Sequence, residues 1–207
     1  ESSLTARGRA LTNILDLPED EKIRAFVSLR DFEQDAYLIM TTRSGIIKKT
    51  KLEEYSRPRA NGIIAINLKS NDELIAVRTS SGSDEILIST KLGQAIRFNE
   101  DKVRSVGRNS MGVKGISLKS DDFVVSSEVI KDSKTQILTI TENGFGKRTE
   151  VEKYRLTSRG GKGVTTLKIT EKTGKIVNAF QVDNETDVIL LSSVGKANRL
   201  KASEISI

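Results

Sequence analysis

The stretch Ile137-Leu138-Thr139-Ile140-Thr141-Glu142-Asn143-Gly144 decides the fold, because it is one of four related segments along the chain. In each segment an apolar run ends at a turn glycine, and these glycines, 48, 51 and 51 residues apart, are Gly45, Gly93, Gly144 and Gly195. A second strand with cationic side chains follows each glycine: Lys48 and Lys49, Arg97, Lys147 and Arg148, and Arg199. Self-similarity at a fixed period indicates a repeat architecture.

A second set of glycines repeats in step with the first. Gly62, Gly112 and Gly163 each close a basic loop and open an apolar segment, and Gly8 fits the same place one period earlier. Each unit therefore reads strand, tight turn, strand, basic loop, strand, turn, strand, with the Gly, Asn, Asp and Ser turns typical of hairpins. The only helical signal is a possible short turn near residues 99–103.

About fifty residues and four strands per unit is the size of a propeller blade. We therefore expect an all-β, propeller-like domain with blades at 34–83, 84–133 and 134–185 and half blades at 1–33 and 186–207. Runs that are apolar at consecutive positions, such as Val188 to Leu191, predict sheets covered on both faces. We expect the half blades to be the cut edges of a longer array.

The composition limits the chemistry available to the chain. There is no His and no Cys, which excludes a disulfide framework, a Cys/His zinc site and a His-based triad. Gly160-Gly161-Lys162-Gly163 lacks the spacing of a P-loop. No signal or membrane-spanning segment is evident. We expect a cytoplasmic chain without membrane partner, and with no catalytic residue, metal or cofactor of its own.

The basic loops are the candidate binding site. They run over residues 56–62, 107–115 and 158–163, and they contain Gly, Arg and Lys but no aromatic residue. Glycine lets backbone N–H groups approach an anion, and cations add charge, so the loops suit phosphate contacts better than base stacking. Ordinary solvated turns, and solvent-facing positions for the strand cations, remain alternatives. The candidate DNA-binding residues are Arg7, Arg9, Lys48, Lys49, Arg57, Arg59, Arg97, Arg108, Lys114, Lys147, Arg148, Arg159, Gly160, Gly161, Lys162, Gly163, Lys196 and Arg199.

Three stretches carry a resemblance to a known family. They are residues 140–149, Ile-Thr-Glu-Asn-Gly-Phe-Gly-Lys-Arg-Thr, with 158–163, and residues 106–116, which match a Gly-Arg-x-x-x-Gly-Val-x-Gly pattern. The chain resembles the C-terminal domains of bacterial DNA gyrase A subunits over essentially its whole length. The resemblance implies a six-bladed β-pinwheel whose blades exchange strands and whose basic rim binds, bends and wraps double-stranded DNA without sequence specificity.

The resemblance also implies a larger setting and leaves some questions open. It implies an A2B2 enzyme with the breakage-reunion domain and the B subunit, in which ATP and Mg²⁺ support negative supercoiling at the nucleoid. The family's Gln-basic-Arg-Gly-Gly-basic-Gly box is incomplete here, with Thr157 and Ser158 before Arg159. We therefore expect the complete box, and a first blade, upstream of Glu1. The alternatives are the A-type subunit of topoisomerase IV, a propeller scaffold for protein partners, and, least supported, an enzyme acting on a small anion.

Overall fold

The computed structural model describes residues 23–29, 31–32, 35–59 and 62–207. The described part is built from short strands joined by hairpins and one-turn 3-10 helices. The strands are β1 (Tyr37–Thr42), β2 (Ile46–Lys51), β3 (Leu74–Ser80), β4 (Glu85–Thr90), β5 (Gln94–Asn99), β6 (Val113–Lys114), β7 (Val124–Ile130), β8 (Gln136–Thr141), β9 (Gly146–Glu150), β10 (Val164–Thr165), β11 (Ile176–Val182), β12 (Asp187–Leu191) and β13 (Ala197–Lys201). The 3-10 turns are η2 (Leu52–Tyr55), η3 (Glu100–Lys102), η4 (Val151–Lys153) and η5 (Ala202–Glu204).

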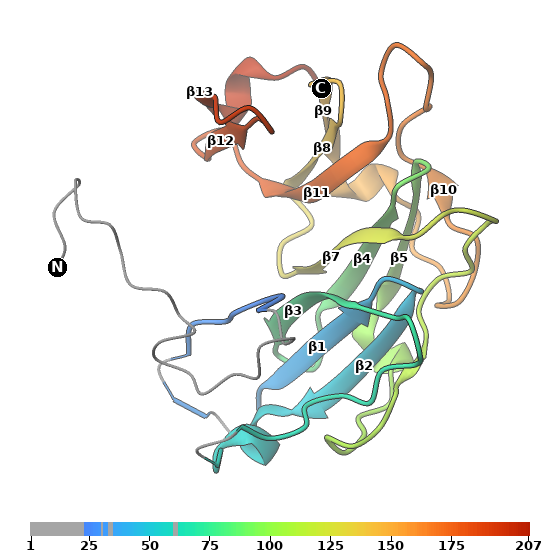
Figure 1. The fold of residues 1–207 in the computed structure, drawn as a ribbon, viewed down its shortest axis with the longest axis vertical. Helices are drawn as coiled ribbons and strands as arrows, with labels where there is room; N and C mark the ends of the chain where they lie inside the picture. Colours follow the sequence, from blue (N-terminus) through green and yellow to red (C-terminus); the bar gives the residue numbers. More distant parts are fainter. Residues whose placement is uncertain (1–22, 30, 33–34, 60–61) are drawn as a thin grey trace, which may run out of the picture.

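These strands form four antiparallel sheets that follow one another in an arc (Figure 1). The first sheet has the order β3-β1-β2-β6, the second β10-β5-β4-β7, the third β11-β8-β9 and the fourth β12-β13. Each contains one of the four predicted hairpins, turning at a glycine. The predicted all-β, propeller-type fold is confirmed, and the turn predicted near residues 99–103 is η3.

A sheet and a sequence repeat are different units in this fold. Strand β6 pairs with β2 at Ile46 and Ile47, and β10 pairs with β5 at Gln94 and Ala95. In each of these two sheets, the other three strands belong to one sequence repeat, and the short strand belongs to the next repeat along the chain. Successive repeats are therefore tied together by backbone hydrogen bonds as well as by side chains. The predicted blade ranges (34–83, 84–133 and 134–185) stay a prediction.

The order of the strands gives each sheet an inner and an outer edge. The inner edges are β3, β7 and β11, and β7 contacts both of the others (Figure 1). The opposite edges of the first two sheets are β6, which lies within the basic loop at 107–115, and β10, which directly follows the basic loop at 158–163. The loops consequently lie on the outer edge of the arc.

The core lies between sheets. Apolar side chains of the first and second sheets form one cluster, those of the second and third a second, and those of the third and fourth another. In β4, Ile86, Leu87 and Ile88 are all fully buried, as the consecutive apolar run predicts. In β12 that prediction is wrong: Ile189 is 64% and Leu191 76% exposed, because no described sheet covers their face.

Candidate nucleic-acid interface

The basic loop at 107–115 is docked by its backbone on the first sheet. Gly112 has a φ of +94°, and a Cβ there would lie 2.5 Å from the carbonyl oxygen of Ile47. The Gly115 amide donates a hydrogen bond of 2.8 Å to the Gly45 carbonyl. Glycine at these places lets the loop lie directly on the strand, so its exposed side chains project from a fixed platform.

The basic loop at 158–163 is tied to the loop before it. Arg159 Nε donates to the Lys102 carbonyl at 2.8 Å, and its Nη1 donates to the Lys114 carbonyl at 2.9 Å. The Gly160 amide donates to the Gly115 carbonyl at 2.6 Å. The half-buried Arg159 guanidinium therefore links two repeats, a role that sequence reasoning missed, whereas Lys162 in the same loop is exposed.

Four of the predicted strand cations are buried. The exposed fraction is 0% for Lys48, 6% for Lys49, 9% for Arg97 and 6% for Arg148. Direct contact with DNA and a solvent-facing position both require an exposed side chain, so burial overturns both interpretations for these four. Their amino and guanidinium groups are instead satisfied inside the protein, as buried charges require.

The two buried arginines connect each repeat with the next. Arg97 Nη1 donates to the carbonyls of Val151 and Tyr154, both at 3.0 Å, at the two ends of turn η4. Arg148 occupies the same place one repeat later, and its Nε donates to the Ile205 carbonyl at 2.7 Å. A planar guanidinium with several donors suits this task, because it can hold separate carbonyls at once. These arginines are structural clamps.

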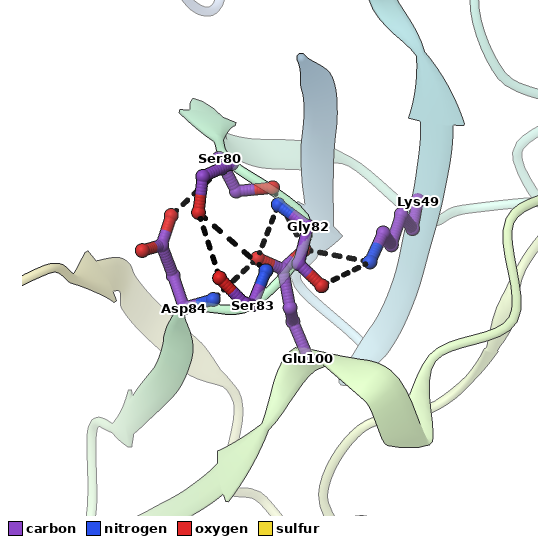
Figure 2. Close-up of polar contacts among 7 residues, drawn as sticks. Lys49, Ser80, Gly82, Ser83, Asp84 and Glu100 are labelled. Atoms are coloured by element: carbon purple, nitrogen blue, oxygen red, sulfur yellow. Dashed lines mark hydrogen bonds and ion pairs between the residues drawn. The ribbon is translucent and has the colours of Figure 1, made fainter. Parts of the chain in front are cut away.

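At the equivalent place in the first sheet, a buried ion pair replaces the arginine clamp (Figure 2). Lys49 Nζ lies 2.8 Å from Glu100 Oε2, and Glu100 is fully buried. The carboxylate also accepts hydrogen bonds from the Gly82 amide at 2.9 Å, the Asp84 amide at 2.7 Å and the Ser80 hydroxyl at 2.8 Å. Glu100 thus joins β2 to the β3–β4 connection, and four donors compensate its buried charge.

The remaining buried cation, Lys48, gives a pH-dependent prediction. Its Nζ donates to the carbonyls of Ala65 and Arg108, and burial lowers its pKa from 10.5 to about 8, against the opposing effect of Glu54. Between these pH values the unfolded chain binds the proton and the folded chain does not. The free energy of unfolding should therefore rise as pH increases from 8 toward 10.5.

Urea denaturation at pH 7.5 and 9.5 measures that rise, and the variant Lys48→Met should reduce it. Lys147 occupies the equivalent strand position two hairpins further on and is exposed, so Lys147→Met is the matched control and should leave the rise unchanged. An equal pH response in the wild type and in Lys48→Met would contradict the assignment.

The other predicted residues divide by exposure. Gly160 and Gly163 are half-buried. The aliphatic part of the Lys114 side chain lies over Gly160, and its Cδ is 3.9 Å from where a Cβ would stand on that glycine. Arg108 is half-buried, and Arg199 is exposed but paired with Asp187 at 2.7 Å. Arg7 and Arg9 fall outside the described residues. The exposed candidates without an ion pair among the described residues are Arg57, Arg59, Lys114, Lys147, Gly161, Lys162 and Lys196.

Two exposed arginines next to the loops were missed by sequence reasoning. Arg104 and Arg155 each follow a 3-10 turn, and they are 51 residues apart, the period of the repeat. That spacing was available in the sequence. Both residues precede the glycine-rich segments that define the loops, so the composition of those segments does not include them.

The described residues contain no group of three or more His, Cys, Asp or Glu side chains placed to hold a metal ion. Over those same residues, no helix is long and apolar enough to cross a membrane. The features that set the outer edge apart are therefore its cations and its docked glycine loops.

Comparison with known proteins bears on both fold and family. The family model described as "DNA gyrase C-terminal domain, beta-propeller" matches residues 36–81, 84–131 and 135–183. Among curated proteins, the chain is 45% identical over its whole length to the DNA gyrase A protein of Salmonella typhimurium and 43% identical to that of Staphylococcus epidermidis. The chain spans about a quarter of these relatives, 24% and 23% of their length.

Two solved structures share the fold closely. A DNA gyrase A C-terminal domain superposes with a TM-score of 0.87 at 29% identity, over 97% of this chain and 67% of that one. The C-terminal domain of a DNA topoisomerase IV gives 0.88 at 28% identity, over 96% and 62%. The fold is therefore common to both kinds of domain, and the two curated relatives named above, which match this chain over its whole length, are gyrase A proteins.

Proposed function

Because the chain belongs to the family of DNA gyrase C-terminal domains, we propose that it binds duplex DNA along the outer edge of its arc and bends it. The proposed contacts are electrostatic and made to the phosphate backbone. They neutralise phosphates and release counterions, so they carry little sequence information.

The distribution of charge is the observation that carries this proposal. Residues 103–120, which include the second basic loop, contain Arg104, Arg108, Lys114 and Lys119 and no acidic residue. Residues 154–170, around the third loop, contain Arg155, Arg159, Lys162 and Lys168, again without an acid. A chain with a net charge of only +6 thus concentrates cations in segments that include the loops of the outer edge. A repeated basic edge attracts a long polyanion much more than scattered charges do.

The first loop extends the same pattern. Residues 55–71 contain Arg57, Arg59 and Lys69 and no acid, and all three side chains are exposed. Bending 20–30 base pairs by 40–90° costs about 1–6 kcal/mol, so one loop would not suffice. Contacts from successive repeats along the arc would offset this cost.

Binding to a linear duplex of about 150 base pairs at several salt concentrations tests the proposal. We expect the logarithm of the association constant to fall linearly with the logarithm of salt, by about 0.9 for each phosphate contacted. The variants Arg57→Ala/Arg59→Ala and Lys114→Ala/Lys162→Ala should each lower that slope by about 2. Lys131→Ala/Lys134→Ala, in the exposed turn after inner strand β7, is the control and should not. Absence of binding at low salt would overturn the proposal.

Bending requires its own measurement. If the chain bends DNA around its edge, ligase should close a linear duplex of about 150 base pairs into a circle faster in its presence, because bending brings the two ends together. Binding with no faster closure would mean that the duplex only touches the edge.

The role within a longer protein follows from the same premise. In a complete gyrase A protein, we propose that the bent duplex is presented to the breakage-reunion domain of an A2B2 enzyme. ATP, Mg²⁺ and the B subunit would then drive strand passage and negative supercoiling at the bacterial nucleoid. Within that enzyme this chain would shape the DNA, with its chemistry performed elsewhere.

A further inference from the structure

Arg104 and Arg155 are presented to solvent by a device that recurs in two successive repeats. Each arginine comes just after a 3-10 turn. The residue directly before it, Val103 before Arg104 and Tyr154 before Arg155, is buried, with 2% of its surface exposed. Because neighbouring side chains of an extended segment point to opposite sides, the residue after each buried anchor is directed outward. Both arginines are exposed accordingly.

Arg97 of β5 holds the chain both before and after Arg155. The Arg97 guanidinium binds the carbonyl of Tyr154, immediately before Arg155, at 3.0 Å. The Arg97 carbonyl accepts a hydrogen bond of 2.9 Å from the amide of Thr157, two residues after it. Arg155 therefore has a fixed backbone although its side chain is free.

The segment around Arg104 is held in the same way by Lys49 of β2. The Lys49 ammonium binds Glu100, in the turn before Arg104, at 2.8 Å. The Lys49 carbonyl accepts a hydrogen bond of 2.9 Å from the amide of Val106, two residues after Arg104. Two different clamps thus produce the same outward arginine.

Neither arginine is committed to a partner within the described part of the chain. No ion pair or side-chain hydrogen bond involves Arg104 or Arg155 there, whereas the nearby Lys102 and Lys153 are paired with acids. The positions equivalent to Arg104 and Arg155 after turns η2 and η5 hold Ser56 and Ser206. Of the four turns η2 to η5, only η3 and η4 are therefore followed by an arginine at this position. The segments that continue from them, residues 103–120 and 154–170, carry no acid.

We propose that Arg104 and Arg155 contact phosphates of one bent duplex at successive points along the arc, and that Lys49 and Arg97 are the positioning residues that present them. This proposal rests on the proposed DNA binding and specifies its central contacts. The buried strand cations then serve DNA binding indirectly, by fixing the backbone from which the exposed arginines reach outward. A preordered contact binds more tightly than a mobile one because less entropy is lost.

The salt-dependent binding of Arg104→Ala, Arg155→Ala and the double variant tests this inference. Each single variant should lower the salt slope by about 1 and the double variant by about 2, with affinity weakened on the order of tens-fold at about 0.1 M salt. The pair Arg104→Lys/Arg155→Lys keeps the charge and should retain the slope. Lys131→Ala/Lys134→Ala is again the control, and thermal unfolding should be unchanged in all variants, because both side chains are exposed.

The outcomes separate this inference from the proposed function. If the wild type binds and the double variant keeps its slope and affinity, the arginines are not contacts, and the proposal of DNA binding stands without them. If only one single variant has an effect, the duplex does not cross both repeats, and the paired arrangement is wrong. If the wild type fails to bind, the proposed function itself is wrong.

Discussion

The variant Glu100→Gln should lower the free energy of unfolding by about 3–5 kcal/mol, the cost of leaving a buried charge without its partner. Glu100 Oε1 accepts from the Gly82 and Asp84 amides, and a glutamine oxygen can keep both bonds. Glu100 Oε2 faces Lys49 Nζ at 2.8 Å, and there the substitution places an amide NH2 group against a buried ammonium. The loss therefore arises chiefly from Lys49.

A double-mutant cycle isolates that contribution. Lys49→Met removes the ammonium, so Glu100→Gln should cost much less in the Lys49→Met background than in the wild type. Urea denaturation of the four proteins measures the coupling, which we expect to exceed about 1 kcal/mol. Lys153→Met is the control for removal of an exposed lysine paired with an acid, and it should change stability by less than about 1 kcal/mol. Additive effects of Lys49→Met and Glu100→Gln would contradict the pairing.

The repeat spacing in the sequence predicted the hairpins because each depends on local signals. A β-branched or apolar run followed by a turn glycine recurs four times, and the structure places a hairpin at each one. The sheet to which a strand belongs has no such local signal. Val113 and Lys114 pair with the preceding repeat because Gly112 fits over the Ile47 carbonyl, an approach set by the packing of whole repeats. Only the family resemblance suggested that exchange.

The buried cations show where residue type alone misleads. Lys147 and Arg148 are adjacent in β9, yet Lys147 is exposed and Arg148 is only 6% exposed. Arg148 is tolerated inside because it meets the carbonyl of Ile205, 57 residues later in the chain. Acceptors on a distant turn cannot be inferred from the strand that carries the cation. The sequence predicts cationic side chains at the loops. Which of the predicted cations stay exposed depends on acceptors that come from distant parts of the chain.

Glu100 carries a signal that the sequence does contain. The equivalent positions in the other repeats are Leu52, Val151 and Ala202, all apolar and buried. An acid at a position that is otherwise apolar predicts a buried carboxylate in need of a cation. The partner also differs, because the first repeat has Lys49 where two later ones have Arg97 and Arg148. Comparing repeats position by position therefore indicates a buried carboxylate at Glu100 and an unusual cation at Lys49, whereas their contact with each other is seen only in the structure.

The variant Gly163→Ala should destabilise the chain by about 3 kcal/mol or more and loosen the third basic loop, through backbone strain and overlap together. Gly163 has a φ of +75°, which costs an alanine about 1–2 kcal/mol. Its Cβ would also overlap the backbone carbonyl of Ala95, so β10 would have to leave β5. Gly62→Ala is the matched control, because Gly62 occupies the same repeat position with a φ of +77°, but no contact within 4 Å of its added Cβ is found among the described residues.

Thermal and urea unfolding of the two glycine variants give their difference in stability directly. Gly62→Ala should show only the backbone cost, and the excess for Gly163→Ala measures the docking of the loop on the second sheet. Hydrogen exchange should then be faster at the Thr166 amide in Gly163→Ala alone, since this amide follows β10 directly and donates to the Gly93 carbonyl at 2.9 Å. Equal destabilisation by the two substitutions would mean that the exchanged strand contributes little. In that case the basic loop would be anchored mainly by Arg159, whose guanidinium holds the Lys102 and Lys114 carbonyls.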